Sequence, residues 1–161
     1  KIFATAGGLN KVRMELAKRM GADLVLNASE EGENIVKIIL NETDGNGVDV
    51  ALEMSGNPTA LKQAFEMLTP GGRVSILGIF KSPVNIDVTN NIVFKAATVY
   101  GITGRRMFQT WYQVRGLLSR PSFREKIASI ITHKIPVRDI AKGMELLNNK
   151  MAAKVALELK W

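Results

Sequence analysis

Residues 48–79 read VDVALEMSGNPTALKQAFEMLTPGGRVSILGI, and this stretch decides the fold. Its two ends, Val48–Met54 and Arg73–Ile79, are mostly apolar, as in strands that are buried on both faces of a sheet. Between them, Asn57 followed by Pro58 predicts a helix start, because asparagine caps a free N–H and proline fits the first turn. Pro70-Gly71-Gly72 predicts the end of that helix. A strand, a helix and a strand in this order predict parallel strands joined by a right-handed crossover.

The same alternation continues on both sides of this unit. Val12, Leu16 and Met20 recur at four-residue spacing, which is typical of one apolar face of a helix. Further strands are expected at Lys1–Ala6, Asp23–Asn27, Val84–Asp87, Ala97–Ile102 and Lys154–Leu159. Further helices are expected at Asn10–Gly21, around Ile35, Ile38 and Ile39, at Thr89–Lys95, Met107–Leu118 and Phe123–Ile131, and around Ile140, Met144 and Leu147. The pattern predicts an α/β fold with a doubly wound parallel sheet.

One part of such a sheet has no counterpart in the sequence. The glycine-rich turn G-x-G-x-x-G lies beside none of the expected strands, so we expect the sheet to lack its first strand and that turn. In the strand order 3-2-1-4-5-6, the absent strand would lie between Lys1–Ala6 and Val48–Met54, with two apolar edges unpaired. We expect the gap to collapse, to take a strand from a neighbouring molecule, or to be filled by another part of a longer protein. The first residue, Lys1 rather than Met, favours a trimmed start.

Composition limits the chemistry. The chain has 161 residues, of which 46% are hydrophobic and 23% charged, as is typical of a folded globular domain. No apolar run approaches the ~18 residues that a membrane span needs and no secretory leader is recognisable, so we expect a cytoplasmic protein without a membrane partner. Cysteine is absent, which excludes disulfides and thiolate metal sites, and the single histidine, His133, cannot form a zinc site unaided.

The formal net charge of +7 raises the question of a nucleic-acid partner. The sequence has no basic arm and no stretch in which basic and aromatic residues alternate. Its basic residues are instead scattered along expected helix faces, as at Lys11, Arg13, Lys18, Arg19, Arg105, Arg106, Arg115 and Arg120. We therefore expect no nucleic-acid partner, and a phosphorylated small molecule explains a local basic cluster equally well.

Glycines stand where four of the expected strands end. They lie in Ala6-Gly7-Gly8, Ser55-Gly56-Asn57, Leu77-Gly78-Ile79 and Ile102-Thr103-Gly104. Ligands of open α/β sheets bind at the carboxyl ends of strands, and a glycine there lets a flat ligand lie against exposed backbone. Each glycine alone also fits an ordinary turn, so the hypothesis of a ligand site depends on the four together.

Taken in order, these motifs resemble a known family. The segment GITGRRMFQTW at Gly101–Trp111, with Glu53–Asn57, Leu77–Ile79 and Thr132–Pro136, resembles the zinc-dependent L-threonine 3-dehydrogenases, which are medium-chain alcohol dehydrogenases. The part GRRMFQTW points to these enzymes rather than to alcohol or polyol relatives. The resemblance covers nearly the whole chain and implies the later part of a Rossmann-like cofactor domain.

The resemblance implies a site for the nicotinamide half of a coenzyme. Leu77, Gly78 and Ile79 match the segment that lies along the nicotinamide ribose, and Ile102 and Thr103 match the backbone pair that contacts the nicotinamide end. The implied reaction is oxidation of the threonine β-hydroxyl to 2-amino-3-ketobutyrate, with hydride passing to NAD while zinc polarises the alcohol. The family's zinc ligands, relay residues and pyrophosphate-binding turn would precede Lys1, so the sequence assigns no catalytic residue and no metal ligand.

The resemblance also places the adenosine half. Arg13 matches an arginine that holds the adenosine ribose, and Gly8 falls where the family has an acidic residue. A carboxylate there binds the free ribose hydroxyls and repels a 2′-phosphate. With Gly7, Gly8, Lys11 and Arg13 in this region, NADP is the alternative to NAD.

Domain organisation and assembly follow from the same resemblance. Residues 1–136 would form an incomplete dinucleotide-binding domain, and residues 137–161 a terminal helix and strand that return toward a catalytic domain. The last sheet strand of the related enzymes pairs across a dimer, so Ala97–Ile102 is the expected contact of a homo-oligomer. Two alternatives stay open: a catalytically silent nucleotide-binding or assembly domain, and another zinc-dependent alcohol or polyol dehydrogenase. We expect packing roles for His133, Trp111 and Tyr112.

Overall fold

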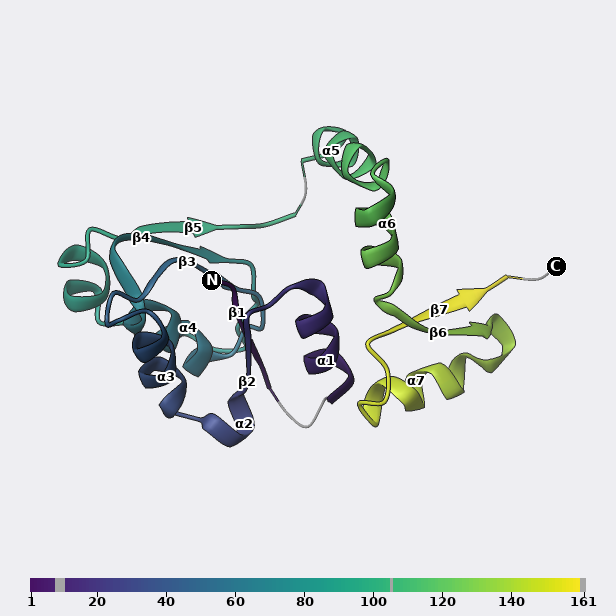
Figure 1. Cartoon of the computed structure of the whole chain (residues 1–161), viewed down its shortest axis with the longest axis horizontal. Helices are drawn as coiled ribbons and strands as arrows, with labels where there is room; N and C mark the ends of the chain where they lie inside the picture. Colours follow the sequence, from purple (N-terminus) through teal and green to yellow (C-terminus); the bar gives the residue numbers. More distant parts are fainter. Residues whose placement is uncertain (8–10, 105, 160–161) are drawn as a thin grey trace. The chain divides into compact units, whose positions relative to one another are not determined.

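The structure is a computed structural model that describes residues 1–7, 11–104 and 106–159 (Figure 1). The chain divides into two compact units. One consists of Lys1–Gly32 together with Arg105–Trp161, and the other of Glu33–Gly104. Both units mix helices with parallel strands, so the expected α/β fold is confirmed.

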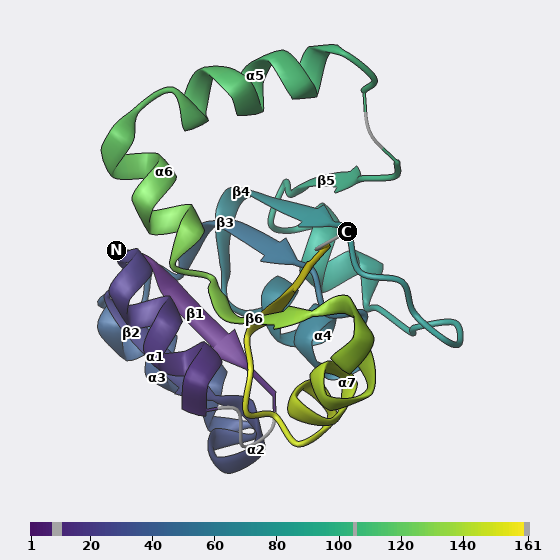
Figure 2. The ribbon, with the colours of Figure 1, turned by 90° about the vertical axis from the view of Figure 1, so that its right-hand side faces the viewer.

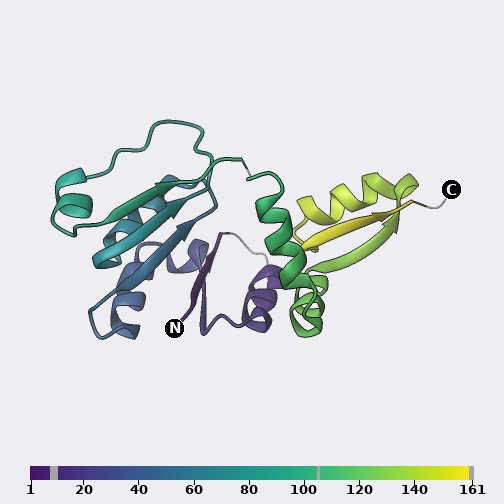
Figure 3. The same ribbon diagram turned by 90° about the horizontal axis from the view of Figure 1, so that it is seen from above.

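The unit Glu33–Gly104 is built around a three-stranded parallel sheet of order β3-β4-β5 (Figure 3). Its strands are β3 (Val48–Glu53), β4 (Leu68–Ile76) and β5 (Thr98–Gly101), and its helices are α3 (Asn34–Glu42), α4 (Pro58–Glu66) and the short π-helix η1 (Thr89–Val93). The Asn57 side chain accepts hydrogen bonds from the amides of Thr59 and Ala60, so the predicted cap of α4 is present. The predicted parallel pairing of β3 with β4, with α4 between them in the chain, is confirmed.

Two expectations in this unit are wrong. Pro70-Gly71-Gly72 does not end a helix, because α4 ends at Glu66 and β4 already begins at Leu68. The helix end is closed instead by Lys95, whose Nζ donates to the carbonyls of Phe65, Glu66 and Leu68. Val84–Asp87 is not a strand; Val84 and Ile86 pack as partly buried side chains against the core.

The core of this unit lies between α4 and one face of the sheet. Phe65 from α4 and Val74 from β4 are fully buried, and Ala51, Leu61, Ala64 and Leu68 complete the cluster. Side chains alternate along a strand, so Leu52 and Met54 of the β3 segment point to the other face and are exposed. The core therefore fixes β3 and β4, whose carboxyl ends carry the candidate site.

The first part of the other unit is a two-stranded parallel sheet with two helices (Figure 2). The strands β1 (Phe3–Ala6) and β2 (Leu24–Asn27) are joined through α1 (Lys11–Met20), which buries Leu16, and α2 (Ala28–Glu31) follows β2 directly. The short helix α2 begins at Asn27, whose side chain accepts a hydrogen bond from the Ser29 amide.

The second part of that unit follows α5 (Gln109–Leu118) and α6 (Pro121–Ala128). Its two strands, β6 (Ile131–Pro136) and β7 (Lys154–Glu158), pair in parallel beside α7 (Ile140–Asn148), which the short helix η2 (Val137–Asp139) precedes (Figure 3). The helix expected to reach Ile131 ends at Ala128, because β-branched Ile131, Thr132 and Ile135 fit the pleat of a strand. The β6–β7 pairing joins residues on both sides of the proposed boundary at residue 136, and that boundary stays a prediction.

The parallel strands form separate sheets rather than one continuous sheet. Within the described parts of the chain, β1 has β2 as its one sheet neighbour, and β3 has β4. In the order 3-2-1-4-5-6, strands 2 and 3 are neighbours, and strands 4, 5 and 6 follow one another. The pairing of β1 with β2 corresponds to strands 2 and 3, and the sheet β3-β4-β5 corresponds to strands 4, 5 and 6. One edge of β1 and one edge of β3 are thus without a described partner strand, as expected for a sheet without its first strand.

Candidate functional site

The candidate site lies at the carboxyl ends of β3, β4 and β5. The amides of Leu77 and Gly78 donate to the carbonyl oxygen of Glu53 over 2.8 and 3.1 Å. The amide of Ile102 donates to the carbonyl oxygen of Ile76 over 2.9 Å. Three strand ends are thus joined by backbone hydrogen bonds, and Leu77 lies beside Ile102.

Apolar side chains are exposed at this joined edge. Leu77 is 46% exposed, Ile102 47% and Ile79 91%. A side chain at Gly101 or Gly104 would meet no atom within 4 Å, so the end of β5 is open. Exposed backbone with flanking apolar groups suits a flat, partly apolar ligand, because such sites combine hydrophobic walls with a few fixed polar groups. We call Leu77–Ile79 with Ile102–Thr103 the strand-end shelf.

A compact hydrogen-bonded turn leads from β3 into α4. The Glu53 carboxylate oxygen Oε1 accepts from the amides of Ser55 and Gly56, over 2.8 and 2.9 Å, and from the Ser55 hydroxyl over 2.5 Å. The Ser55 hydroxyl oxygen in turn accepts from the Asn57 amide over 3.1 Å. Sequence reasoning assigned no role to Glu53, although a carboxylate at the end of an apolar strand was a signal that could have identified it.

Two glycines allow the turn and the shelf to touch. Gly56 has φ +69°, and a side chain there would overlap the carbonyl group of Ile79. A side chain at Gly78 would overlap the Glu53 carboxylate and the Gly56 amide. Glycine is therefore required at both positions for spatial reasons, and at Gly56 for its backbone conformation as well.

The residues expected at the adenosine half lie elsewhere in the chain. Arg13 is exposed on α1, in the unit that contains Lys1–Gly32, whereas the shelf belongs to the unit Glu33–Gly104. Gly8 lies outside the described residues. A side chain at Gly7, directly after β1, would meet open space. The structure brings together the two segments Leu77–Ile79 and Ile102–Thr103, which the resemblance assigns to the nicotinamide half.

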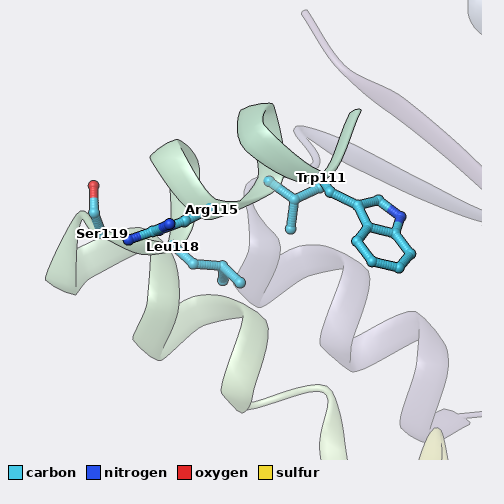
Figure 4. Close-up of a pocket in the computed structure, with 5 residues that line it drawn as sticks. Trp111, Arg115, Leu118 and Ser119 are labelled. Carbon is cyan, nitrogen blue, oxygen red and sulfur yellow. The ribbon is translucent and has the colours of Figure 1, made fainter. Parts of the chain in front are cut away.

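A shallow hollow lies on α5 (Figure 4). Trp111, Val114, Arg115 and Leu118 line it with Ser119 at the helix end. Phe108 precedes the helix with φ +66°, and its ring meets Trp111 edge-on with the centroids 6.4 Å apart. One helix provides the whole lining, so this hollow has no convergent polar groups of the kind that orient a small ligand. The packing roles expected for Trp111 and Tyr112 stay predictions.

Two kinds of site are absent from the described parts of the chain. No group of three or more His, Asp or Glu side chains there could hold a metal ion. None of the described helices is long and apolar enough to cross a membrane.

Comparisons with known proteins identify relatives along nearly the whole chain. The L-threonine 3-dehydrogenase of Caldanaerobacter subterraneus subsp. tengcongensis is 50% identical over 145 residues, which cover 90% of this chain and 41% of the relative. The L-threonine 3-dehydrogenase of Pyrococcus furiosus is 49% identical over 152 residues, covering 94% and 42%. These relatives confirm the resemblance to threonine dehydrogenases. The chain spans about 42% of the length of the curated relatives it matches.

Solved structures with the same fold are alcohol dehydrogenases. The 2R,3R-butanediol dehydrogenase of Bacillus subtilis matches with a TM-score of 0.81 and 31% identity, covering 98% of this chain and 44% of that one. An alcohol dehydrogenase of Thermotoga maritima matches with a TM-score of 0.80 and 31% identity, covering 96% and 42%. A family profile described as zinc-binding dehydrogenase matches residues 1–120. Because this match extends over most of its length, the chain belongs to the zinc-binding dehydrogenase family.

Proposed function

We propose that this chain is the coenzyme-binding portion of an L-threonine 3-dehydrogenase. The complete enzyme would oxidise the β-hydroxyl of L-threonine to 2-amino-3-ketobutyrate and transfer the hydride to NAD, giving NADH and a proton. The proposal is supported by relatives near 50% identity that carry this name, and by the family profile over residues 1–120. The chain alone would bind the coenzyme without performing the reaction.

The observation that carries the proposal is the joined pair of strand ends. The bond from the Ile102 amide to the Ile76 carbonyl puts Ile102 beside Leu77, so the two segments that the resemblance assigns to the nicotinamide half form one surface. In the proposed complex, Leu77, Gly78 and Ile79 follow the nicotinamide ribose, and the Ile102 and Thr103 backbone faces the nicotinamide. Exposed apolar side chains at Leu77 and Ile102 would shield the ring from water.

The residues proposed for the adenosine half of the coenzyme come from the resemblance alone. We assign Arg13 to the adenosine ribose and Gly8 to the position of the missing carboxylate. Without a carboxylate, the region does not repel a 2′-phosphate, and Lys11 adds positive charge nearby in the sequence. NAD is the proposed coenzyme, because the relatives are threonine dehydrogenases, and NADP is the alternative.

The described residues do not supply the zinc site that the family name implies. They hold no cluster of three potential ligands, so no step of the reaction is assigned to a metal held by them. This part of the proposal concerns coenzyme binding alone.

Titration with NADH and with NADPH, followed by coenzyme fluorescence, tests the proposal. Saturable binding of NADH at micromolar concentrations supports it, and tighter binding of NADPH would reverse the choice of coenzyme. If neither coenzyme binds, the result would favour the alternative of a catalytically silent domain. The absence of a G-x-G-x-x-G turn from the sequence also points to that alternative.

Another alcohol or polyol dehydrogenase is the second alternative, because the butanediol dehydrogenase shares the fold at 31% identity. Assay of the complete enzyme with L-threonine and 2,3-butanediol separates these substrates.

We also propose a cytoplasmic location and assembly into a homo-oligomer through β5. Every residue of β5 is exposed, and in the described structure the strand pairs on one edge, with β4. An edge strand with Val99 and Tyr100 exposed is suited to pairing with a second copy. Tyr100→Arg would reduce the mass of the assembly in sedimentation equilibrium, and an unchanged mass would contradict this contact.

A further inference from the structure

Glu53 is a buried carboxylate at the end of an otherwise apolar strand. It is the last residue of β3, and 4% of its surface is exposed. Burying a carboxylate is costly unless hydrogen bonds replace those it loses from water. A carboxylate at this buried strand end therefore needs hydrogen bonds from the protein itself.

Its two carboxylate oxygens differ in their surroundings. Oε1 accepts three hydrogen bonds, from the Ser55 amide, the Ser55 hydroxyl and the Gly56 amide. Oε2 is buried and has no hydrogen-bond partner among the described residues. It lies against Gly78, where a side chain would overlap it. A buried polar atom without a partner is rare in native proteins and calls for an explanation.

The backbone of the same residue holds the shelf. The Glu53 carbonyl oxygen accepts from the amides of Leu77 and Gly78. The side chain of Glu53 thus fixes the turn at Ser55 and Gly56, while its backbone fixes the first residues of the shelf. Gly56 also touches the Ile79 carbonyl group closely, so turn and shelf contact each other at two places.

We propose that Glu53 is a positioning residue for the coenzyme. Its carboxylate holds the Ser55-Gly56 turn against Leu77–Ile79. It thereby fixes the position of the strand-end shelf on which the nicotinamide half lies. The inference rests on the proposed function. A shelf of backbone atoms binds well only if it is held in place, because small displacements of binding groups weaken binding strongly.

Glu53→Gln is the sharpest substitution, because it keeps the shape and removes the charge. The amide oxygen can still accept from the turn, but the NH2 group then takes the place of Oε2, which is buried against Gly78 and has no hydrogen-bond partner in the described structure. Asp49→Asn is the matched control, since Asp49 is exposed on the same strand and the change in charge is the same. Ser55→Ala is a milder second variant that removes only the hydroxyl donor.

Two measurements on the whole protein separate this inference from the proposed function. The first is the NADH dissociation constant, which should rise at least about tenfold in Glu53→Gln, because unsatisfied buried groups are costly. The dissociation constant should rise less in Ser55→Ala, and it should not change in Asp49→Asn. The second is amide hydrogen exchange without coenzyme, which should accelerate at Leu77 and Gly78 while core amides such as Val74 keep their rates.

The outcomes decide between the claims. If the unsubstituted protein binds no NADH, the proposed function fails, and exchange at Leu77 and Gly78 alone decides whether Glu53 holds the shelf. Unchanged exchange at these amides in both Glu53→Gln and Ser55→Ala overturns the inference. So does faster exchange throughout the unit, Val74 included, because Glu53 would then stabilise the fold without positioning the shelf. Local acceleration with an unchanged dissociation constant in a protein that binds NADH also overturns it. Should Glu53→Gln fail to fold, Ser55→Ala decides by the same criteria.

Discussion

The backbone amide of Ile102 donates a hydrogen bond to the carbonyl oxygen of Ile76 over 2.9 Å, and so joins the ends of β5 and β4. The residue after Ile76 is Leu77, whose amide is bonded in turn to Glu53 at the end of β3. Strands from distant parts of the sequence thus present one continuous edge. In parallel sheets such edges bind ligands, because all strands end there with free backbone groups.

Ile102→Asp should weaken coenzyme binding without unfolding the protein. The side chain is about half exposed, so the substitution buries little new charge. A carboxylate at the shelf would repel the anionic coenzyme, and we expect the NADH dissociation constant to rise about tenfold, or ~1.4 kcal/mol. Val93→Asp, at an exposed position in η1, is the control and should leave fluorescence titrations unchanged. Equal affinities of the two variants would place the coenzyme elsewhere.

Gly56→Ala should destabilise the protein more than Gly71→Ala. Both glycines have positive φ, so both substitutions carry the strain of a left-handed conformation. A side chain at Gly71 would meet open space, whereas one at Gly56 would overlap the Ile79 carbonyl group. We expect an additional loss of about 1–3 kcal/mol for Gly56→Ala in urea unfolding, as for other overpacked sites. Similar losses at both positions would show that turn and shelf do not touch.

Lys95→Met should reveal how the end of α4 is held. The ammonium group donates to three carbonyls, of Phe65 and Glu66 at the end of α4 and of Leu68 just beyond it. Carbonyls at the end of a helix lack the amide partners that the helix interior provides. Burial lowers the pKa of Lys95, and the negative charge of Glu66 opposes that shift. Methionine keeps the apolar stem and removes the donors, so we expect a loss of about 1–3 kcal/mol in the free energy of unfolding. Lys62→Met, at an exposed position on α4, should change it by less than about 0.5 kcal/mol.

Asp87 should make stability depend on pH in the acidic range. Hydrogen bonds from the Asn90 side chain and amide hold the pKa of this carboxyl below its ordinary value of 3.8. A lowered pKa of an acid in the folded state stabilises the fold above pH 3.8, and this contribution is lost as the pH falls through the folded-state value.

Asp87→Ala should therefore be less stable than the unsubstituted protein at neutral pH, with the difference shrinking under acid. Urea unfolding at several pH values measures it. Asn90→Ala removes the partner and should show the same convergence. A difference that stays constant down to the lowest pH would assign the loss to packing.

The parts of the fold predicted from sequence are those that local chemistry decides. The apolar runs at Val48–Met54 and Arg73–Ile79 gave β3 and β4, because an apolar segment of that length between turn residues is stable mainly inside a sheet. Asn57-Pro58 gave the start of α4, since capping and a fixed φ act within one turn. The strand-end glycines indicated where the strands end, and those ends form the shelf.

The remaining features depend on contacts between distant residues. The end of α4 was misplaced because Lys95, far along the chain, completes it, and no local signal shows this. The strand β6 was partly read as helix because its partner β7 begins at Lys154. The contacts of Glu53 with Leu77 and Gly78 come from another strand, so the proposed positioning role of Glu53 has no local signal. Such long-range contacts override local preference.

Mapping the coenzyme on the protein by NMR tests the central claim most directly. Isotope-labelled protein titrated with NAD should show saturable shifts of the amide signals of Leu77, Gly78, Ile102 and Thr103, while amides of β6 and β7 stay in place. Saturable binding with these four signals unmoved, or no binding at all, would contradict the account.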